Sequence, residues 1–324
     1  MTDGRLVYLN GEYVSEEEAK ISIYDSALMF GDMIFEMTRS FNKKQFKLRE
    51  HIDRLYHGLK IMHIDIGISP TELENICHET QEKNDHLFSD TDEHRLMINI
   101  SRGPLGIYSH IFGGKLEPTI VVADFPLKWT VASMAEYYDN GINSVIPSQR
   151  SIPATLMDPK IKNRSRIWYQ SANIEVSKVE GNNNWALLID PDGYITEGTG
   201  DNFFMVKDGV LYTPEGRNIL RGISRNYVIE LAIENGIPVK ECNIEPYDVY
   251  GADEAFLTGT PFCIIPTTSL NGIDIGSGKM GEMTTRLLDL WSDKVQLDIM
   301  DQIKFYGKEV EKLNNSATPY QFRK

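Results

Sequence analysis

The sequence predicts a mixed α/β chain in two parts, a small α+β domain followed by a larger domain of short strands. Three observations support this prediction. Strand-like and helical stretches alternate over residues 1–124, a proline interrupts the pattern in the segment FPLKWT, and the stretches that follow are mostly short and strand-like. We therefore expect domains at 1–124 and 138–311, a connection at 125–137 and a disordered tail at 312–324.

The first domain is expected to begin with a β-hairpin, because LVYLN and EYV lie on either side of an Asn-Gly turn. Apolar residues at helical spacing predict a helix over 51–62. A second helix, over 71–83, would follow Ser69 as its N-cap and contain Pro70 in its first turn. Further strands are expected at 32–38, 45–48, 95–101 and 119–123.

The second domain is expected to contain two helices among its strands, over 165–179 and 223–234. The later helix would end at an Asn-Gly pair that a proline follows, which is a common stop signal. A Lys-Asp-Gly turn at 207–209 would join two strands as a hairpin. The expected strands lie at 143–146, 185–189, 202–206, 210–213 and 254–257.

Composition excludes several classes of protein. A formal net charge of −14 argues against nucleic-acid binding, which needs a cationic surface. The three cysteines are widely spaced and form no CxxC pair, so we expect neither disulfides nor a zinc site, and we expect a reducing compartment. No apolar run approaches the roughly 18 residues of a membrane span, and the N-terminus does not resemble a signal peptide. These features predict a cytoplasmic protein without a membrane or metal site.

Three short patterns could carry chemistry. Gly222-Ile223-Ser224 begins a helix, where exposed N–H groups can bind a phosphate. Thr258-Gly259-Thr260, with Pro261 after it, would let the backbone approach an oxyanion. Glu197, beside two glycines, could lie against a planar ring. Taken alone, each pattern is more often structural: an N-cap, a turn and a solvated hairpin acid.

One lysine stands among positive charges. Lys162 follows Lys160 and precedes Arg164 and Arg166. Positive neighbours lower the pKa of a lysine, as a Schiff-base lysine requires. A salt-bridged basic surface would give the same pattern. No HExxH, P-loop or GxSxG motif suggests another chemistry.

Taken together and in their order along the chain, these motifs resemble those of the class IV aminotransferases, which use pyridoxal 5′-phosphate. That family includes branched-chain amino acid aminotransferases, D-amino acid aminotransferases, (R)-selective amine transaminases and aminodeoxychorismate lyase. The most specific element is YITEGTGDNFFMVKDGVLYTP at 194–214. The segments EHIDRL, GPLG, ILRGISR and DEAFLTGT support the resemblance, which extends from the N-terminal LNGEYV to about residue 290.

The resemblance implies a D-amino acid aminotransferase-like fold, with a barrel-like larger domain and the cofactor between the domains. It also implies a role for each matching residue. Lys162 would bind the cofactor covalently and carry the proton between the substrate and the cofactor. Glu197 would pair with the pyridine nitrogen. The phosphate would be bound by Arg54, Ile223, Ser224 and Thr260.

Departures from the family pattern bear on the substrate. The F-E-G motif of branched-chain enzymes is Phe35-Glu36-Met37 here, and the Arg-x-His pair of D-amino acid enzymes is absent. We expect Phe30, Phe35 and Met37 to form an apolar pocket wall from one strand, with Pro261 also near the substrate. Arg39 or Arg95 would then meet a second carboxylate, unless both are salt-bridged scaffold residues.

The predicted function is transfer of an amino group from a hydrophobic, branched-chain-like amino acid to a 2-oxo acid such as 2-oxoglutarate. A D-amino acid or (R)-amine transaminase is the next alternative, and an aminodeoxychorismate lyase is the third. A pyridoxal phosphate-binding protein without turnover is the alternative outside enzymes. The resemblance further implies a homodimer.

Overall fold

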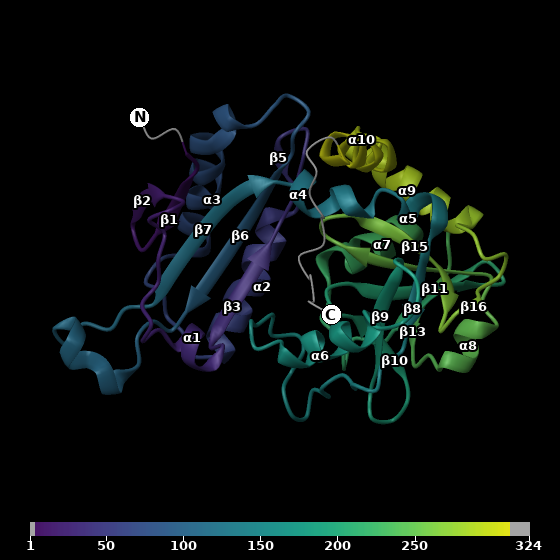
Figure 1. Cartoon of the computed structure of the whole chain (residues 1–324), viewed down its shortest axis with the longest axis horizontal. Helices are drawn as coiled ribbons and strands as arrows, with labels where there is room; N and C mark the ends of the chain where they lie inside the picture. Colours follow the sequence, from purple (N-terminus) through teal and green to yellow (C-terminus); the bar gives the residue numbers. More distant parts are fainter. Residues whose placement is uncertain (1–3, 312–324) are drawn as a thin grey trace. The chain divides into compact units, whose positions relative to one another are not determined.

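The computed structural model describes residues 4–311, and contacts within the chain divide it into two compact units (Figure 1). Among the described residues, the first unit comprises 4–127 and 161–166, and the second comprises 128–160 and 167–311. The division after Leu127 falls inside the connection expected at 125–137. The tail expected at 312–324 lies outside the described residues.

The return of Ile161–Arg166 to the first unit was not predicted from the sequence. This segment lies along strand β3 (Met33–Met37), where the Phe35 N–H donates to the Lys162 carbonyl at 3.0 Å. The Arg164 N–H likewise donates to the Met33 carbonyl at 2.9 Å. Two backbone bonds across more than a hundred residues of chain leave no local pattern in the sequence.

The first unit contains a five-stranded antiparallel sheet that two helices cover on one face (Figure 1). The helices are α2 (Leu48–Ile61) and α3 (Pro70–Asn84). The strand order is β2 (Glu12–Ser15), β1 (Leu6–Leu9), β7 (Thr119–Pro126), β6 (His94–Ser101) and β3. The expected hairpin is confirmed, because β1 pairs with β2 and its turn residues Asn10 and Gly11 have φ of 49° and 99°.

Strand alternation separates the two faces of this sheet. Ile34, Leu96 and Ile98 are fully buried in the core cluster beside apolar residues of α2 and α3. Each such buried side chain contributes about 1.5–3 kcal/mol. Helix α3 begins as predicted, because Ser69 forms a capping box with Glu72 and Pro70 occupies the first turn.

The remaining elements of the first unit are short: α1 (Ser26–Phe30), β4 (Ser40–Phe41), β5 (Lys44–Gln45), and the 3₁₀ helices η1 (Asp85–Leu87) and η2 (Gly106–Phe112). The strand expected at 45–48 is therefore wrong in its second half. Lys47 adopts a left-handed conformation with φ of 49°, which ends the extended segment, and Leu48 already begins α2.

The second unit contains a closed ring of strands, which agrees with the expected barrel-like domain. The ring order is β10 (Ile195–Gly198), β9 (Asn184–Ile189), β8 (Ile142–Val145), β15 (Cys263–Leu270), β14 (Glu254–Gly259) and β11 (Asn202–Lys207). Strand β11 pairs back with β10 through Asn202 and Glu197 and closes the ring. Strands β12 (Val210–Pro214) and β13 (Val239–Cys242) extend the sheet from β11, and β16 (Ile273–Asp274) pairs with β15.

Helices of the second unit pack on these strands. The predicted helix over 223–234 is confirmed as α7 (Ile223–Glu234), and the helix expected over 165–179 is the shorter α6 (Ile167–Val176). Helices α9 (Glu282–Val295) and α10 (Ile299–Glu311) were not predicted. Short helical segments complete the unit: α4 (Lys128–Val131), η3 (Ala132–Met134), α5 (Tyr137–Asn140) and α8 (Pro246–Tyr250). Over residues 4–311, no helix combines the length and apolar character needed to cross a membrane.

Candidate functional site

A buried carboxylate lies at the centre of the first unit's polar cluster. Glu36, on β3, accepts hydrogen bonds from Arg54 Nε at 2.6 Å and Nη2 at 2.8 Å. His51 Nδ1 lies 2.7 Å from Glu36 Oε2. His51 and Arg54 are three residues apart on α2, so both side chains lie on the helix face that packs on β3. Three polar groups are thus joined inside an apolar core.

The charges of this cluster follow from its burial. Burial alone would raise the pKa of Glu36, but the adjacent Arg54 guanidinium holds that pKa far below its usual range. Burial lowers the pKa of His51, and the charges of Arg54 and Lys162 act in the same direction against the opposing effect of Glu36. His51 is therefore neutral at pH 7 and donates its Nδ1–H to an ionised Glu36.

The two candidate lysines have different surroundings. Lys162 Nζ lies 4.8 Å from the centre of the Phe35 ring, and the charge of Lys162 acts on His51 within the first unit. Lys160, in the second unit, forms an ion pair with Asp158 at 2.8 Å and donates to the Arg217 carbonyl at 3.0 Å. Lys160 is thus held in a local structural role.

Arginines gather on the sheet face of the first unit that carries Phe35 and Met37. The Arg164 guanidinium lies 3.6 Å from the centre of the Phe35 ring and donates to Asn99 Oδ1 at 2.9 and 3.0 Å. Arg39 is buried, lies over the Phe41 ring and donates from Nε to the Ser40 carbonyl at 3.1 Å.

Arg95 is the unusual member of this group. Its side chain is 8% exposed, and among the described residues Nε and Nη1 have no hydrogen-bond partner. Nη2 makes a weak contact of 3.7 Å with Met37 Sδ. Burial, followed by the charges of Arg39 and Arg164, lowers the pKa of Arg95 to about 10. A buried guanidinium in this state favours binding of an anion.

In the second unit, Glu197 lies at the centre of a separate cluster. Its carboxylate accepts hydrogen bonds from Tyr169 Oη at 2.8 Å, the Leu220 N–H at 2.9 Å and Asn202 Nδ2 at 3.1 Å. Glu197 is buried within β10, so the alternative of a solvated hairpin acid is wrong. These three donors hold the carboxylate in one orientation.

The hydroxyl-glycine motifs meet beside this carboxylate. Asn202 pairs with Glu197 on one side and with Thr258 of β14 on the other. Gly222, the N-cap of α7, lies so close to Asn202 that a Cβ at Gly222 would clash with Oδ1. Cross-strand register and this close approach therefore bring together three motifs that are far apart in sequence.

The residues of this unit that are expected to bind phosphate or substrate belong to these motifs or follow them directly. Ile223 and Ser224 begin α7, whose first N–H groups have no partner within the helix itself. Thr260 and Pro261 form the half-buried turn between β14 and β15. The expectation that Phe30 shares a strand with Phe35 and Met37 is wrong. Phe30 ends α1, and Gly31, with φ of 67°, separates it from β3.

Sequence reasoning missed Glu36, His51 and Tyr169 as members of these clusters. An acidic residue inside the apolar strand MIFEM was a usable signal, because a buried carboxylate needs a cationic partner. No comparable signal marked Tyr169, which lies on a helix and reaches Glu197 only through tertiary packing.

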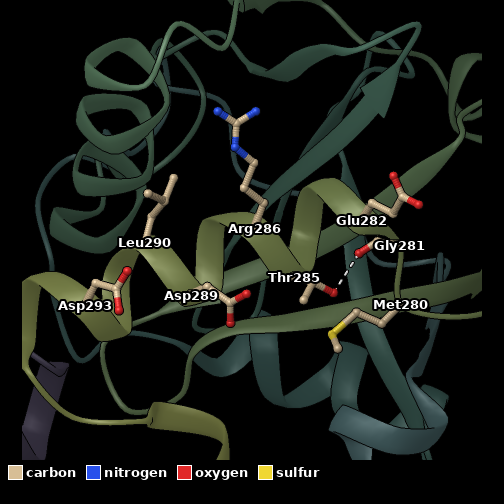
Figure 2. Close-up of a pocket in the computed structure, with 8 residues that line it drawn as sticks. All are labelled: Met280, Gly281, Glu282, Thr285, Arg286, Asp289, Leu290 and Asp293. Atoms are coloured by element: carbon tan, nitrogen blue, oxygen red, sulfur yellow. Dashed lines mark hydrogen bonds between the residues drawn. The ribbon is translucent and has the colours of Figure 1, made fainter.

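The hollow along α9 has a different character (Figure 2). It is an open groove on the surface, and Thr285 in it donates to the Gly281 carbonyl at 2.9 Å. Its lining residues are Met280, Gly281, Glu282, Thr285, Arg286, Asp289, Leu290 and Asp293. None of these is a predicted site residue. Over residues 4–311, no group of three or more side chains is arranged to bind a metal ion.

The chain is similar in sequence to known proteins of one family. The family model described as amino-transferase class IV matches residues 33–270. The chain is 32% identical over 292 residues to the branched-chain-amino-acid aminotransferase of Escherichia coli (strain K12), covering 87% of this chain and 90% of that protein. It is 30% identical over 279 residues to the D-alanine aminotransferase of Bacillus licheniformis, covering 86% and 93%.

The fold is also similar to a solved structure. The crystal structure of the branched-chain aminotransferase from the thermophilic archaeon Thermoproteus uzoniensis with norvaline matches with a TM-score of 0.77 and 27% identity. The match covers 93% of this chain and 97% of that chain.

Proposed function

Because this chain belongs to the class IV aminotransferases, we propose that it binds pyridoxal 5′-phosphate and transfers amino groups from hydrophobic amino acids to 2-oxoglutarate. When bound, this cofactor supplies an electron sink for charge that develops at the substrate Cα. The proposed cofactor residues are Lys162, Arg54, Glu197, Ile223, Ser224 and Thr260. The residues present fit this cofactor, and each group has a distinct task.

The orientation of Glu197 is the observation that carries the proposal. Three donors are directed at its two oxygens and hold the carboxylate in one orientation, and an ionised carboxylate in that position accepts hydrogen bonds but donates none. An ionised acceptor of this kind holds a proton on a heteroaromatic nitrogen. Protonation at that nitrogen increases the capacity of the ring to accept electrons.

Two groups supply phosphate binding. Arg54 carries a positive charge on a planar group with several N–H donors, which suits a phosphate dianion. The N-terminus of α7 offers the backbone N–H groups of Ile223 and Ser224 together with a hydroxyl. Gly222 supports this assignment, because a larger residue there would displace Asn202.

Lys162 is the proposed residue for covalent attachment and proton transfer at Cα. Its surroundings are cationic, since Arg164 and Arg166 also lie over the Phe35 ring, at 3.6 and 5.3 Å. The neutral amine is the form of a lysine that attacks a carbonyl carbon and accepts a proton. Lys160, by contrast, is held in an ion pair with Asp158.

Arg95 supports the choice of a dicarboxylate as one substrate. The second carboxylate of 2-oxoglutarate would provide the anion that Nε and Nη1 lack among the described residues. Phe35 and Met37, on the same sheet face, would contact a hydrophobic side chain when the other substrate binds. One set of residues could thus serve both halves of the reaction.

A D-amino acid donor is the second candidate. The similarity to the D-alanine aminotransferase of Bacillus licheniformis favours it, and the geometry of Glu197 and Arg95 does not distinguish the enantiomers. An (R)-amine donor or a lyase reaction would each show as a separate result in the test below.

We further propose that the enzyme is a homodimer. In the first unit, apolar side chains are exposed on α1 and η2: Leu28, Met29, Phe30, Ile107 and Ile111. Exposed apolar groups in this number suggest a protein–protein interface. Sedimentation of the purified protein would give the oligomeric state, and a monomer would contradict this part of the proposal.

Half-reaction spectra test the function directly. Purified protein would be mixed separately with leucine, D-alanine, glutamate, aspartate and (R)-1-phenylethylamine. The absorbance of the pyridoxal form of the cofactor would be followed, because this form is consumed when an amino group is transferred. We expect fast reactions with leucine and glutamate, and a slow one with aspartate. Reaction with the amine alone would reject an amino acid donor, and reaction with D-alanine alone would favour the second candidate.

A second test concerns the lysine that binds the cofactor covalently. Borohydride reduction should fix the cofactor permanently to the wild-type protein and to Lys160→Ala, but not to Lys162→Ala.

A further inference from the structure

Glu36 is a charged residue in a strand where its neighbours are apolar. In β3 (MIFEM) it shares the helix-facing side with Ile34, and its side chain has no exposed surface. Burying an ionised carboxylate is unfavourable unless specific partners compensate. A residue at such a position therefore needs an explanation beyond the packing of the sheet.

The exposures of its partners are graded. The Glu36 side chain is 0% exposed, that of His51 is 2% exposed and that of Arg54 is 14% exposed. Arg54 therefore extends from the buried carboxylate to the surface of the cluster. Among these three groups, the guanidinium is the one that a ligand can reach.

The contact with Glu36 fixes how that guanidinium is oriented. Its bonds from Nε and Nη2 to the two carboxylate oxygens define the plane and the rotation of the group. His51 bonds to Oε2, which also accepts from Arg54 Nη2, and so prevents the carboxylate from rotating. The five donors of a guanidinium lie in one plane at fixed angles, so a contact that fixes two of them also fixes the directions of the others.

We propose that Glu36, supported by His51, is a positioning residue that holds Arg54 in one orientation for the phosphate group of the cofactor. This inference rests on the proposed role of Arg54 in phosphate binding. Glu36 touches neither substrate nor cofactor and acts only through Arg54. The competing explanation is a buried ion pair that stabilises the first unit and does nothing for the ligand.

Two ligands separate these explanations. Pyridoxamine 5′-phosphate carries the phosphate, and pyridoxamine lacks it but keeps the ring. Dissociation constants of both would be measured on cofactor-free protein prepared from the purified enzyme. The variants are Glu36→Gln, His51→Gln and Arg54→Lys. Arg49→Ala is the matched control, because Arg49 lies on the same helix and forms an exposed ion pair with Asp53 at 2.9 Å.

Glu36→Gln keeps the shape of the side chain but removes its charge and one acceptor. We expect its affinity for pyridoxamine 5′-phosphate to fall about ten- to a hundredfold, since a charge-assisted hydrogen bond is lost or misdirected. Its affinity for pyridoxamine should change less than about threefold, because the ring contacts do not involve Arg54. Arg54→Lys should show the same selective loss, His51→Gln a smaller one and Arg49→Ala none. The phosphorus NMR shift of the bound phosphate should move in Glu36→Gln and remain unchanged in Arg49→Ala.

Other outcomes would overturn the inference in distinguishable ways. An equal loss for both ligands in Glu36→Gln would show a purely structural role. Selective loss in Arg54→Lys with unchanged binding in Glu36→Gln would reject positioning by Glu36 and leave the proposed function standing. Unchanged phosphate affinity in Arg54→Lys would instead reject the proposed role of Arg54. Should Glu36→Gln fail to fold, Glu36→Asp keeps the charge but shortens its reach, and it should show the same phosphate-specific loss.

Discussion

The Tyr169 hydroxyl donates to Glu197 Oε1 at 2.8 Å and so joins helix α6 to strand β10 within the second unit. Both groups are buried, and a hydrogen bond between a neutral donor and a carboxylate is stronger than one between neutral groups. The bond therefore fixes the direction of the carboxylate that we propose for the cofactor nitrogen.

Two substitutions test this relationship. Glu197→Gln should retain the cofactor but slow the half-reaction by several orders of magnitude, because an amide cannot hold the ring nitrogen proton. Tyr169→Phe removes one of three donors, and we expect a smaller loss of about ten- to a hundredfold in single-turnover rate. Rates are measured by stopped-flow absorbance. Near-normal rates in Glu197→Gln would reject its role at the nitrogen.

Gly222→Ala should damage the second unit through Asn202. The φ of Gly222 is −62°, which alanine adopts without strain, so the effect would come from the clash with Asn202 Oδ1. We expect a loss of about 1–3 kcal/mol in the free energy of unfolding, as is typical of overpacking, together with weaker cofactor binding.

Gly200→Ala is the matched control for this substitution. Gly200 lies in the nearby segment TGDN, and a Cβ there would meet no atom within 4 Å. Urea denaturation of the two variants compares them directly. Equal stability of Gly222→Ala and Gly200→Ala would show that the close approach to Asn202 is unimportant.

The success of sequence reasoning depended on the range of the interactions involved. Helices α3 and α7 were predicted because their boundaries are encoded locally, by Ser69 and Pro70 in one case and by the Asn-Gly pair after Glu234 in the other. Strand β10 was missed because it is short and followed by glycines, and its pairing partners β9 and β11 are established only in the folded ring.

The same distinction holds for the candidate site. Lys162 and Glu197 were predicted as site residues from ordered motifs, which can be read directly from the sequence. The arrangement of Glu36, His51 and Arg54 depends on how α2 packs on β3, and no spacing rule gives that packing. Phe30 was assigned to the wrong element because helix α1 and the left-handed Gly31 that ends it were not predicted.

The contribution of His94 and Asp124 to the stability of the first unit should decrease as the pH rises from mildly acidic to alkaline values. His94 is fully buried between Asp124 at 2.8 Å and Asp85 at 2.9 Å. Burial alone would lower the pKa of His94, but the two carboxylates raise it. Burial raises the pKa of Asp124 to about 6, and His94 opposes this only in part.

The sign of the effect follows from these directions. A group whose pKa is higher in the folded state stabilises that state below its unfolded pKa and loses this contribution as the pH rises through the folded pKa. For Asp124 the loss occurs between about pH 4 and pH 6, and for His94 it begins above about pH 6.5. A tenfold change in proton affinity corresponds to about 1.4 kcal/mol, so we expect the contribution of this pair to decline by about 1–3 kcal/mol.

Urea denaturation at pH 5, 6, 7 and 8 measures this decline, with the pH values chosen to span the ordinary histidine range of about 6.5. Asp124→Asn should flatten the profile, because it removes one titrating group and the partner of the other. Asp253→Asn is the control: its carboxylate is exposed and paired with Lys207, and its lowered pKa places its titration well below this range. An identical slope in wild type and Asp124→Asn would contradict the assignment.

The last prediction concerns Arg95, for which stability and activity should change in opposite directions. Arg95→Leu removes a buried guanidinium whose Nε and Nη1 have no partner among the described residues, so the free energy of unfolding should rise by about 1–3 kcal/mol. The KM for 2-oxoglutarate should rise about ten- to a hundredfold, since the second carboxylate would lose a charge-assisted contact. The KM for a hydrophobic 2-oxo acid should stay close to wild type.

Arg225→Leu provides the contrast. Arg225 is also buried, but it donates to Glu241 at 2.6 Å and to the Pro214 carbonyl at 2.9 Å, so its removal should destabilise the second unit. Opposite signs for the two arginines would indicate that Arg95 is retained for a ligand at a cost in stability. Destabilisation in Arg95→Leu with an unchanged KM for 2-oxoglutarate would instead make Arg95 a scaffold residue, and the recognition of a second carboxylate would then have to be sought at Arg39.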